Sequence, residues 1–345
     1  MFFLLSLAGC SCTPANRSQV DNQAAEITAV EETEEDDEEG PPLVLPPVGG
    51  VLPVSSFSEI WAYVVAGREA ALTKDLPLSD IGYFGAEVDT YGKLTGVPRR
   101  QNLSFSGRVH LVVACGSRSL THFVLVPGSN ERRALIADLL EAAKNYDGLQ
   151  IDFEYVPPRD GDTFLSFLRE LRSGLGGKRF TIALSARTRK LADDVYDYEK
   201  IKPYVDRILV MAYDEHWSGS TPGSIASLQW CRRVAEYSLN VIGPEKLIMG
   251  IPFYGRAWGN HNPSRALLYS TTENLIKERK INDVKRENGI PTFDYDISIA
   301  VKVFYEDEYS LSARMEMYKS MNVSSIGFWR LGQETPKVWS ILRLE

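Results

Sequence analysis

After Phe57 the sequence alternates between short apolar runs and longer stretches with helical periodicity. The stretches place apolar residues three or four positions apart, as at Leu135, Leu139 and Ala143. Eight strand-like runs lie between them, at residues 60–65, 81–88, 109–114, 149–153, 180–184, 207–213, 247–252 and 325–329. Eight strands joined by helical crossovers within residues 57–345 predict an α/β fold, a (β/α)8 TIM barrel.

A doubly wound open sheet is the alternative fold for such a pattern. That fold usually carries a glycine-rich phosphate-binding loop after its first strand. No loop of this kind follows residues 60–65. The barrel is therefore the favoured architecture.

The connection between the seventh and eighth predicted strands is unusually long. It spans about residues 257–324 and contains a helical pattern near 272–280, strand-like pieces at 291–294 and 299–305, and a helix near 310–321. Loops that follow barrel strands surround the substrate-binding end. We expect this small α+β insertion to form a wall beside that end.

Residues 1–10 form an apolar segment that ends in Leu7-Ala8-Gly9-Cys10. This ending resembles the lipobox of bacterial lipoproteins, in which cleavage before the cysteine leaves that residue to carry a lipid. The stretch is too short to span a bilayer. No lysine or arginine precedes it, so a plain or truncated signal segment is the alternative. The resemblance implies a lipid on Cys10 and a location outside the cytoplasm, at a bacterial membrane.

Residues 11–56 form an acidic, proline-rich stretch without hydrophobic periodicity. They contain ten acidic residues and one cation, Arg17, and therefore carry a net charge of −9. Such a composition buries too little apolar area to offset the entropy of ordering, so we expect a disordered tether. Because the whole chain carries −8, the remainder is nearly neutral. It lacks the basic excess of nucleic-acid-binding domains, and we expect no nucleic-acid partner.

The fourth predicted strand carries a row of polar side chains. It reads Asp147-Gly148-Leu149-Gln150-Ile151-Asp152-Phe153-Glu154, and Pro157-Pro158 ends it. Because side chains alternate along a strand, Gln150, Asp152 and Glu154 share the face toward the barrel interior, with Glu154 at the C-terminal end where barrel active sites lie. An ionised Asp152 disfavours a second charge nearby. This predicts a protonated Glu154, able to act as the general acid in glycoside cleavage.

A purely structural role is the alternative for these acids, since buried carboxylates often pair only with internal arginine or lysine. We interpret Asp147 as an anchor at the start of the strand rather than a catalyst. Cys115 and Cys231 are interpreted as apolar packing residues. No Cys–His spacing resembles a zinc site, so we predict neither a metal nor a cofactor.

Residues 147–154 resemble the DxxDxDxE signature of family 18 glycoside hydrolases, the chitinase and N-acetylglucosaminidase family. Two further elements follow in the family's order. The first, Met211-Ala212-Tyr213-Asp214, resembles its MxYD element, and the second, Gly250-Ile251-Pro252-Phe253-Tyr254-Gly255-Arg256, resembles its seventh-strand signature. Trp329 matches the aromatic residue beneath the family's sugar subsite. The resemblance extends along most of residues 57–345.

The resemblance implies a retaining mechanism in which the substrate assists. Glu154 would protonate the glycosidic oxygen and later activate water, while the substrate's own 2-acetamido carbonyl attacks the anomeric carbon. Asp152 would orient that acetamide and stabilise the positive oxazolinium intermediate, and Tyr213 would donate a hydrogen bond to the acetamido oxygen. The substrates would be glycans built of N-acetylated sugars.

Gln150 stands where the family pattern has its middle aspartate. An amide does not share a proton with Asp152 as a carboxylate does. The spore-cortex-lytic branch of the family carries an amide there and resembles residues 151–158, which shifts the expected substrate from chitin to peptidoglycan. A chitinase and a non-catalytic glycan-binding barrel are the alternatives. Non-enzymatic relatives typically lack the acid at the Glu154 position, which favours an enzyme.

Several further residues are candidate substrate contacts at the C-terminal end of the barrel. Asp214 either supports the acetamide pocket or is structural, and Tyr254 and Arg256 either line the cleft or brace the barrel. Trp329 is favoured as a stacking surface over core packing. The full set of predicted substrate contacts is Gln150, Asp214, Trp217, Tyr254, Arg256 and Trp329. We expect the protein to act as a monomer.

Overall fold

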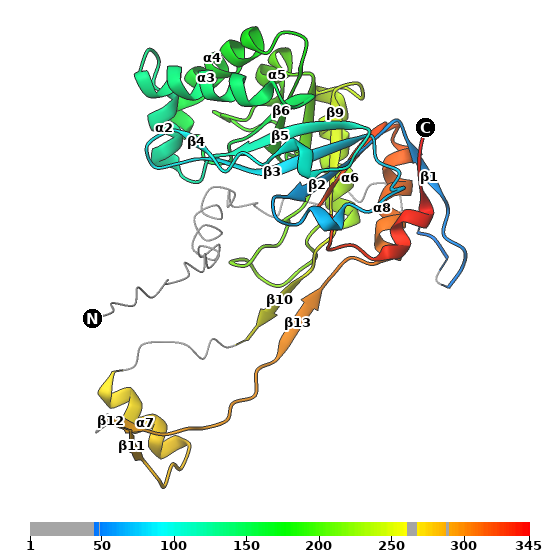
Figure 1. Cartoon of the computed structure of the whole chain (residues 1–345). Coiled ribbons are helices and arrows are strands. Elements are labelled where there is room, and N and C mark those ends of the chain that lie inside the picture. Colours follow the sequence, from blue (N-terminus) through cyan, green and yellow to red (C-terminus); the bar gives the residue numbers. More distant parts are fainter. Residues whose placement is uncertain (1–44, 48, 261–267, 288–289) are drawn as a thin grey trace, which may run out of the picture.

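The computed structural model describes residues 45–47, 49–260, 268–287 and 290–345. Within them, eight parallel strands form a barrel, closed by the pairing of β2 with both β3 and β14 (Figure 1). The strands are β2 Glu59–Val65, β3 Asp80–Val88, β5 Arg108–Ala114, β6 Gly148–Asp152, β7 Arg179–Ser185, β8 Arg207–Met211, β9 Leu247–Pro252 and β14 Ser325–Trp329. Each overlaps one of the predicted runs. The predicted TIM barrel is confirmed.

Helices cover the outside of the barrel (Figure 1). They are α2 Arg118–Leu125, α3 Asn130–Ala143, α4 Gly161–Gly174, α5 Tyr198–Ile201, α6 Leu228–Val241 and α8 Glu308–Ser320. In α4 the buried residues lie at helical spacing, at Phe164, Phe167, Leu168 and Leu171. The helix ends just before Gly176, whose φ of 60° suits a residue without a Cβ.

Short elements fill the connections. β1 Ser55–Phe57 pairs with β15 Leu342–Leu344, and β4 Leu94–Thr95 pairs with β3. The 3-10 helices are η1 Glu69–Ala71, η2 Arg100–Asn102, η3 Pro158–Asp160, η4 Lys202–Tyr204 and η5 Pro336–Ile341.

The buried core has two parts, which follow the alternation of side chains along the strands. The larger part lies between the barrel and its helices and includes Leu149 and Ile151 of β6. The smaller part contains buried residues of the barrel strands, namely Trp61, Tyr63, Val112, Ala183, Leu209 and Ile248. These side chains fill the barrel interior, so the barrel is a packed core rather than a pore.

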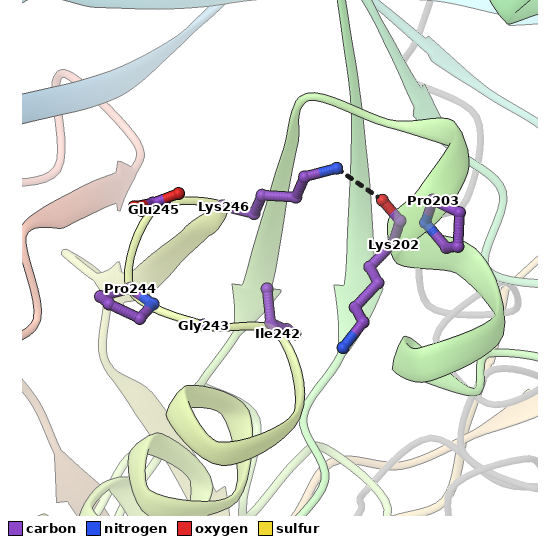
Figure 2. A pocket seen from close by; sticks show the side chains of 7 residues that line it. All are labelled: Lys202, Pro203, Ile242, Gly243, Pro244, Glu245 and Lys246. Atoms are coloured by element: carbon purple, nitrogen blue, oxygen red, sulfur yellow. Dashed lines mark hydrogen bonds between the residues drawn. The ribbon is translucent and has the colours of Figure 1, made fainter.

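The loops that lead into the strands form the N-terminal end of the barrel. An open hollow there is lined by residues 202–203 and 242–246 (Figure 2). The ammonium group of Lys246 donates to the carbonyl of Lys202 at 2.7 Å, and that of Lys202 donates to the carbonyl of Val241 at 2.7 Å. Both lysines therefore tie loops together. The hollow precedes β8 and β9, so it lies at the end of the barrel opposite the predicted acids.

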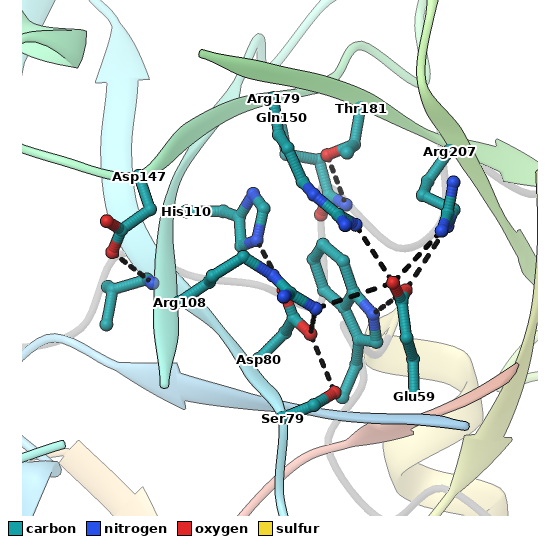
Figure 3. A network of polar contacts seen from close by, with 12 residues as sticks. Glu59, Ser79, Asp80, Arg108, His110, Asp147, Gln150, Arg179, Thr181 and Arg207 are labelled. Atoms are coloured by element: carbon teal, nitrogen blue, oxygen red, sulfur yellow. Dashed lines mark hydrogen bonds and ion pairs between the residues drawn. The ribbon is translucent and has the colours of Figure 1, made fainter. Parts of the chain in front are cut away.

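A charged network closes the N-terminal end of the barrel (Figure 3). Glu59, which begins β2, accepts hydrogen bonds from Arg108 at 3.4 Å, Arg179 at 2.9 Å and Arg207 at 3.0 Å. These arginines begin three other strands of the barrel. The glutamate is almost fully buried, and although burial opposes its ionisation, the arginine hydrogen bonds lower its pKa. The network holds the strand starts in register around one carboxylate.

Asp80 forms the second half of this network. It is fully buried, and its carboxylate contacts Arg108 at 2.7 Å and His110 at 2.8 Å. Although burial opposes ionisation, the hydrogen bonds with His110 and Arg108 lower the pKa of Asp80 to about 2. Asp80 therefore stays ionised in neutral and mildly acidic solution. Asp147 has the predicted anchoring role, since its carboxylate accepts a hydrogen bond from the amide of Val109 at 2.8 Å (Figure 3).

The insertion after β9 contains the predicted elements but lies elsewhere than expected. β10 Arg256–Gly259 and β13 Val301–Phe304 form an antiparallel ribbon that leads away from the barrel. At its far end lie α7 Tyr269–Glu278, β11 Lys285–Glu287 and β12 Ile290–Thr292 (Figure 1). The expectation of a wall beside the barrel is wrong for this outer part. A physical reason is the antiparallel pairing of β10 with β13, which carries the chain away from the barrel before α7 begins. In that position α7 buries only Leu275.

The described residues do not include residues 1–44. The roles predicted for Cys10, for the signal segment and for most of the tether therefore remain predictions. The described chain begins beside α8, where the hydroxyl of Tyr309 donates to the carbonyl of Pro46 at 2.8 Å. None of the helices in the described part of the chain combines the length and apolarity needed to cross a bilayer.

Candidate active site

β6 turns its polar residues into the barrel, as the alternation of side chains predicted. Gln150 is fully buried and Asp152 is 8% exposed, whereas Leu149 and Ile151 pack in the outer core. The strand ends at Asp152 rather than at residue 153. Glu154 therefore lies in the turn that follows the strand, where it is exposed. Of the two acids at the C-terminal end, Asp152 is thus buried and Glu154 is open to solvent.

Gln150 is held between two hydroxyl groups beneath Asp152. The hydroxyl of Tyr63 donates to the side-chain carbonyl of Gln150 at 2.5 Å, and the Gln150 amide donates to Oγ1 of Thr181 at 3.1 Å. All three residues are buried. Because the amide oxygen only accepts and its nitrogen only donates, these contacts fix the orientation of the amide. A direct contact between Gln150 and a substrate stays a prediction.

Tyr63 is a site residue that the sequence analysis missed. Burial raises its pKa, and the nearby charge of Asp152 raises it further, so the phenol keeps its proton. A signal for it was present, because Tyr63 lies two positions after Trp61 in the first strand and therefore shares its inward face. A tyrosine inside an apolar run is also common in ordinary cores, and this conceals its role.

Trp329 forms the base of the open end. Its ring centroid lies 5.3 Å from that of Tyr63 and 5.3 Å from that of Phe84, and the contact with Phe84 is edge-on. The indole is half-buried, so it packs on the core below while its remaining surface faces outward. Gly327 on the same strand leaves room for the barrel core, since a Cβ there would lie 2.7 Å from the side chain of Leu209. The Trp329–Arg330 peptide bond is cis.

Tyr213 follows β8 and shares its electrostatic environment with both acids. Burial raises its pKa well above the ordinary value, assisted by Tyr63, Tyr254, Asp152 and Glu154. Tyr213 therefore keeps its proton and can act as a hydrogen-bond donor. Gly250 makes room for the ring, because a Cβ at that position would lie 3.0 Å from it and 2.7 Å from the carbonyl of Val210. This explains why the seventh-strand element begins with glycine.

Three predicted substrate contacts come together in one cluster. Asp214 accepts hydrogen bonds from the hydroxyl of Tyr254 at 2.5 Å and from the guanidinium of Arg256 at 2.8 Å. The guanidinium also lies over the Tyr254 ring, 5.6 Å from its centroid. Asp214 has a φ of 61°, a conformation that aspartate tolerates better than most residues. The Tyr254 ring meets Tyr213 edge-on at 6.2 Å, so the cluster adjoins the acids.

The loop after β8 joins the active-site end to the insertion. Its base is closed by Glu215, whose carboxylate accepts hydrogen bonds from the amide and hydroxyl of Ser227 at 2.6 Å and 2.9 Å. Farther along, the indole N–H of Trp258 on β10 donates to the carbonyl of Trp217 at 3.2 Å. The Trp217 side chain is partly exposed. Its predicted contact with substrate stays a prediction.

The other candidate chemical groups are accounted for structurally. Cys115 and Cys231 are free and buried, which confirms their interpretation as packing residues. His122 contacts Asp160 at 2.9 Å on the outside of the barrel. Among the residues that the structure describes, no group of three or more His, Cys, Asp or Glu is arranged to hold a metal ion.

The model of one known protein family matches most of this barrel. The model of Glycosyl hydrolases family 18 matches residues 95–334, which is more than half of the chain. The chain belongs to glycosyl hydrolase family 18. This confirms the resemblance seen in residues 147–154 and in the elements that follow them.

Relatives of this family 18 chain include two proteins of Bacillus subtilis (strain 168). It is 32% identical over 211 residues to the protein named "Uncharacterized glycosylase YvbX", covering 58% of this chain and 61% of that one. It is 26% identical over 235 residues to the "Cortical fragment-lytic enzyme", covering 64% and 54%. The chain thus matches between about half and three fifths of the length of these curated relatives.

Solved structures share the fold of this chain. The spore cortex-lytic enzyme SleL of Bacillus cereus superposes with a TM-score of 0.63 at 22% identity, over 84% of this chain and 74% of that one. A chitinase from Chromobacterium violaceum ATCC 12472 gives a TM-score of 0.65 at 22% identity, over 82% and 97%. At these identities the likeness concerns the barrel architecture.

Proposed function

We propose that this family 18 protein hydrolyses β-N-acetylglucosaminyl linkages with retention of configuration and with assistance from the substrate. The observation that carries the proposal is the placement of the two acids. Asp152 is buried at the end of β6, and Glu154 is exposed in the turn directly beyond it. A proton donor that meets solvent and a carboxylate held below it are what the reaction needs.

Glu154 acts in this proposal as the acid and then as the base. It gives its proton to the glycosidic oxygen as the bond to the anomeric carbon breaks, and later takes a proton from the attacking water. Its exposed position lets it reach the oxygen of a glycan lying over the C-terminal end of the barrel. Trp329 offers the apolar face of a sugar ring a surface for stacking.

Asp152 and Tyr213 act in this proposal on the substrate's acetamide group. The acetamide carbonyl attacks the anomeric carbon and forms a positively charged oxazolinium, which the Asp152 carboxylate stabilises. Tyr213 is half-buried, and desolvation together with the neighbouring tyrosines and acids raises its pKa, so it keeps its proton and donates a hydrogen bond to the acetamide oxygen. Substrates without the N-acetyl group lack the internal nucleophile and are not cleaved.

Peptidoglycan is the substrate we favour. Gln150 donates to Thr181 and accepts from Tyr63, and its amide does not titrate, so it does not share an acidic proton with Asp152. This amide accompanies the resemblance to the spore-cortex-lytic branch, and the curated relatives include proteins named cortical fragment-lytic enzyme. A chitinase is the second candidate, because another relative is named "Probable chitinase 2" and is 32% identical over 141 residues.

A substrate panel tests the proposal. The purified chain is incubated with peptidoglycan fragments, chitooligosaccharides and cello-oligosaccharides, and the reducing ends are followed by proton NMR. We expect cleavage of the N-acetylated glycans, fastest for peptidoglycan, with the β-anomer appearing first. Cleavage of cello-oligosaccharides, or a first product in the α-configuration, would contradict the mechanism. Binding of the N-acetylated glycans without cleavage would favour the glycan-binding alternative.

We also propose that the enzyme acts as a monomer outside the cytoplasmic membrane, held there by a lipid on Cys10. The support is the lipobox-like ending of residues 1–10 and the acidic stretch that follows. When the full-length gene is expressed with a labelled fatty acid, we expect label on the wild-type protein and none on Cys10→Ala. Cys12→Ala is the matched control and should retain the label. Equal labelling of all three proteins would overturn the anchor.

A further inference from the structure

The turn that carries Glu154 is held together by a side chain from a different loop. The hydroxyl of Tyr196 donates to the carbonyl of Phe153 at 2.7 Å and accepts from the amide of Val156 at 2.8 Å. These two peptide groups flank Glu154 on either side. In a simple β-turn the first carbonyl and the fourth amide bond directly to each other. Here the tyrosine hydroxyl connects them instead.

The tyrosine and both peptide groups are buried. Phe153 is 1% exposed, Val156 is 3% exposed and Tyr196 is 4% exposed. Buried peptide groups without a partner are costly, so the turn depends on the hydroxyl. The adjoining Pro157-Pro158 has no amide hydrogens with which to form alternative bonds.

Tyr196 is itself fixed by the loop that follows β7. Its backbone amide donates to the carboxylate of Asp194 at 3.0 Å. The same carboxylate pairs with the guanidinium of Arg187, at 2.7 Å and 3.1 Å, in a two-point contact. The ring of Tyr196 meets Phe164 of α4 edge-on at 6.2 Å. The hydroxyl therefore has little freedom to leave the turn.

We propose that Tyr196 is a positioning residue for Glu154, which it holds over the scissile bond by bridging the two ends of the turn. This inference rests on the proposed glycosidase function of Glu154. The hydroxyl of Tyr196 bonds to two backbone groups of the turn, so Tyr196 acts through the backbone. General acid catalysis requires the acid within hydrogen-bond reach of the leaving oxygen, and small displacements are therefore expensive in rate.

Tyr196→Phe in the full chain tests the proposal, because it removes the bridging hydroxyl and keeps the packed ring. Tyr198→Phe is the matched control. Tyr198 is also fully buried, lies two residues away, and donates to a strand-end carbonyl, that of Ser185 at 2.6 Å. That bond anchors β7 and does not involve the Glu154 turn. Because Tyr198 begins α5 directly after the loop, the control reports the general cost of losing a buried tyrosine hydroxyl in this region.

We expect Tyr196→Phe to lower kcat roughly tenfold on the most rapidly cleaved glycan, with KM changed less than about twofold. Tyr198→Phe should keep kcat within about twofold of wild type. Wild-type kcat in Tyr196→Phe would overturn the proposal, and so would an equal loss in both variants. A merely structural role predicts the equal loss.

Hydrogen exchange provides a readout that needs no activity. In Tyr196→Phe the peptides covering residues 153–160 should exchange their amide hydrogens at least several-fold faster than in wild type or Tyr198→Phe. Unchanged exchange there would overturn the proposal. If the wild type cleaves no glycan, the glycosidase function fails, and exchange alone then decides whether the hydroxyl holds the turn.

Discussion

Glu154→Gln is expected to lower kcat by about 10³-fold on N-acetylated glycans, within the usual range for loss of a general acid and base. The amide keeps the size of the side chain but donates no proton to a leaving oxygen. KM should change little, because the exposed side chain in the turn after β6 contributes mainly in the transition state. Initial rates on peptidoglycan fragments and chitooligosaccharides measure the effect.

An activated leaving group makes this test specific. In a glycoside of 2,4-dinitrophenol the leaving group is dinitrophenolate, which departs without protonation. The kcat/KM of Glu154→Gln on such a substrate should therefore approach the wild-type value. Glu87→Gln is the matched control, since Glu87 is another exposed glutamate near the C-terminal end of a barrel strand, β3. It should behave as wild type on both substrates. An equally large loss of Glu154→Gln on both would show that the residue is not the acid.

Asp152→Asn is expected to lower kcat by about 10²-fold, comparable to the removal of one electrostatic contact to a transition state. The neutral amide no longer stabilises the positive oxazolinium and no longer orients the acetamide as a charged acceptor. This loss concerns the intermediate and not the leaving group. We therefore expect the same loss in kcat/KM on the dinitrophenyl glycoside as on the natural glycan.

The contrast between the two variants separates the roles of the acids. Rescue of Asp152→Asn by the activated leaving group would contradict its assignment to the intermediate. Asp147→Asn is the control on the same segment, because Asp147 anchors the start of β6 through the amide of Val109. It should lower the midpoint of thermal unfolding while kcat stays near wild type. Thermal unfolding of all variants shows whether any loss of rate reflects loss of fold.

The positions of the barrel strands and the inward face of Asp152 were predictable from the sequence, because both follow from local periodicity. Because successive side chains along a strand point to opposite faces, Gln150 and Asp152 must lie on the same side. The cluster of Asp214, Tyr254 and Arg256 was predictable only as a set of candidates. Only the structure shows that these three side chains bind one another, because the segments that follow β8 and β9 meet in space.

Other features were beyond the sequence for identifiable reasons. The placement of Glu154 in a turn depends on Tyr196, which lies 40 residues from its partner Val156, and no local pattern marks such a pair. The position of the insertion follows from the pairing of β10 with β13, whose residues Arg256 and Phe304 lie far apart in the sequence. The role of Tyr63 could not be predicted, because Gln150, which accepts the hydrogen bond from its hydroxyl, lies on a different strand.

The closed N-terminal end of the barrel limits how a polymer can be handled. Trp61 is fully buried in the barrel interior, and below it Glu59 is held by Arg108, Arg179 and Arg207. A glycan that reaches Asp152 must therefore come and go through the same opening. A long strand cannot be threaded along the barrel axis and has to lie crosswise over the opening. In the proposed reaction, the water that completes hydrolysis would enter through this same opening.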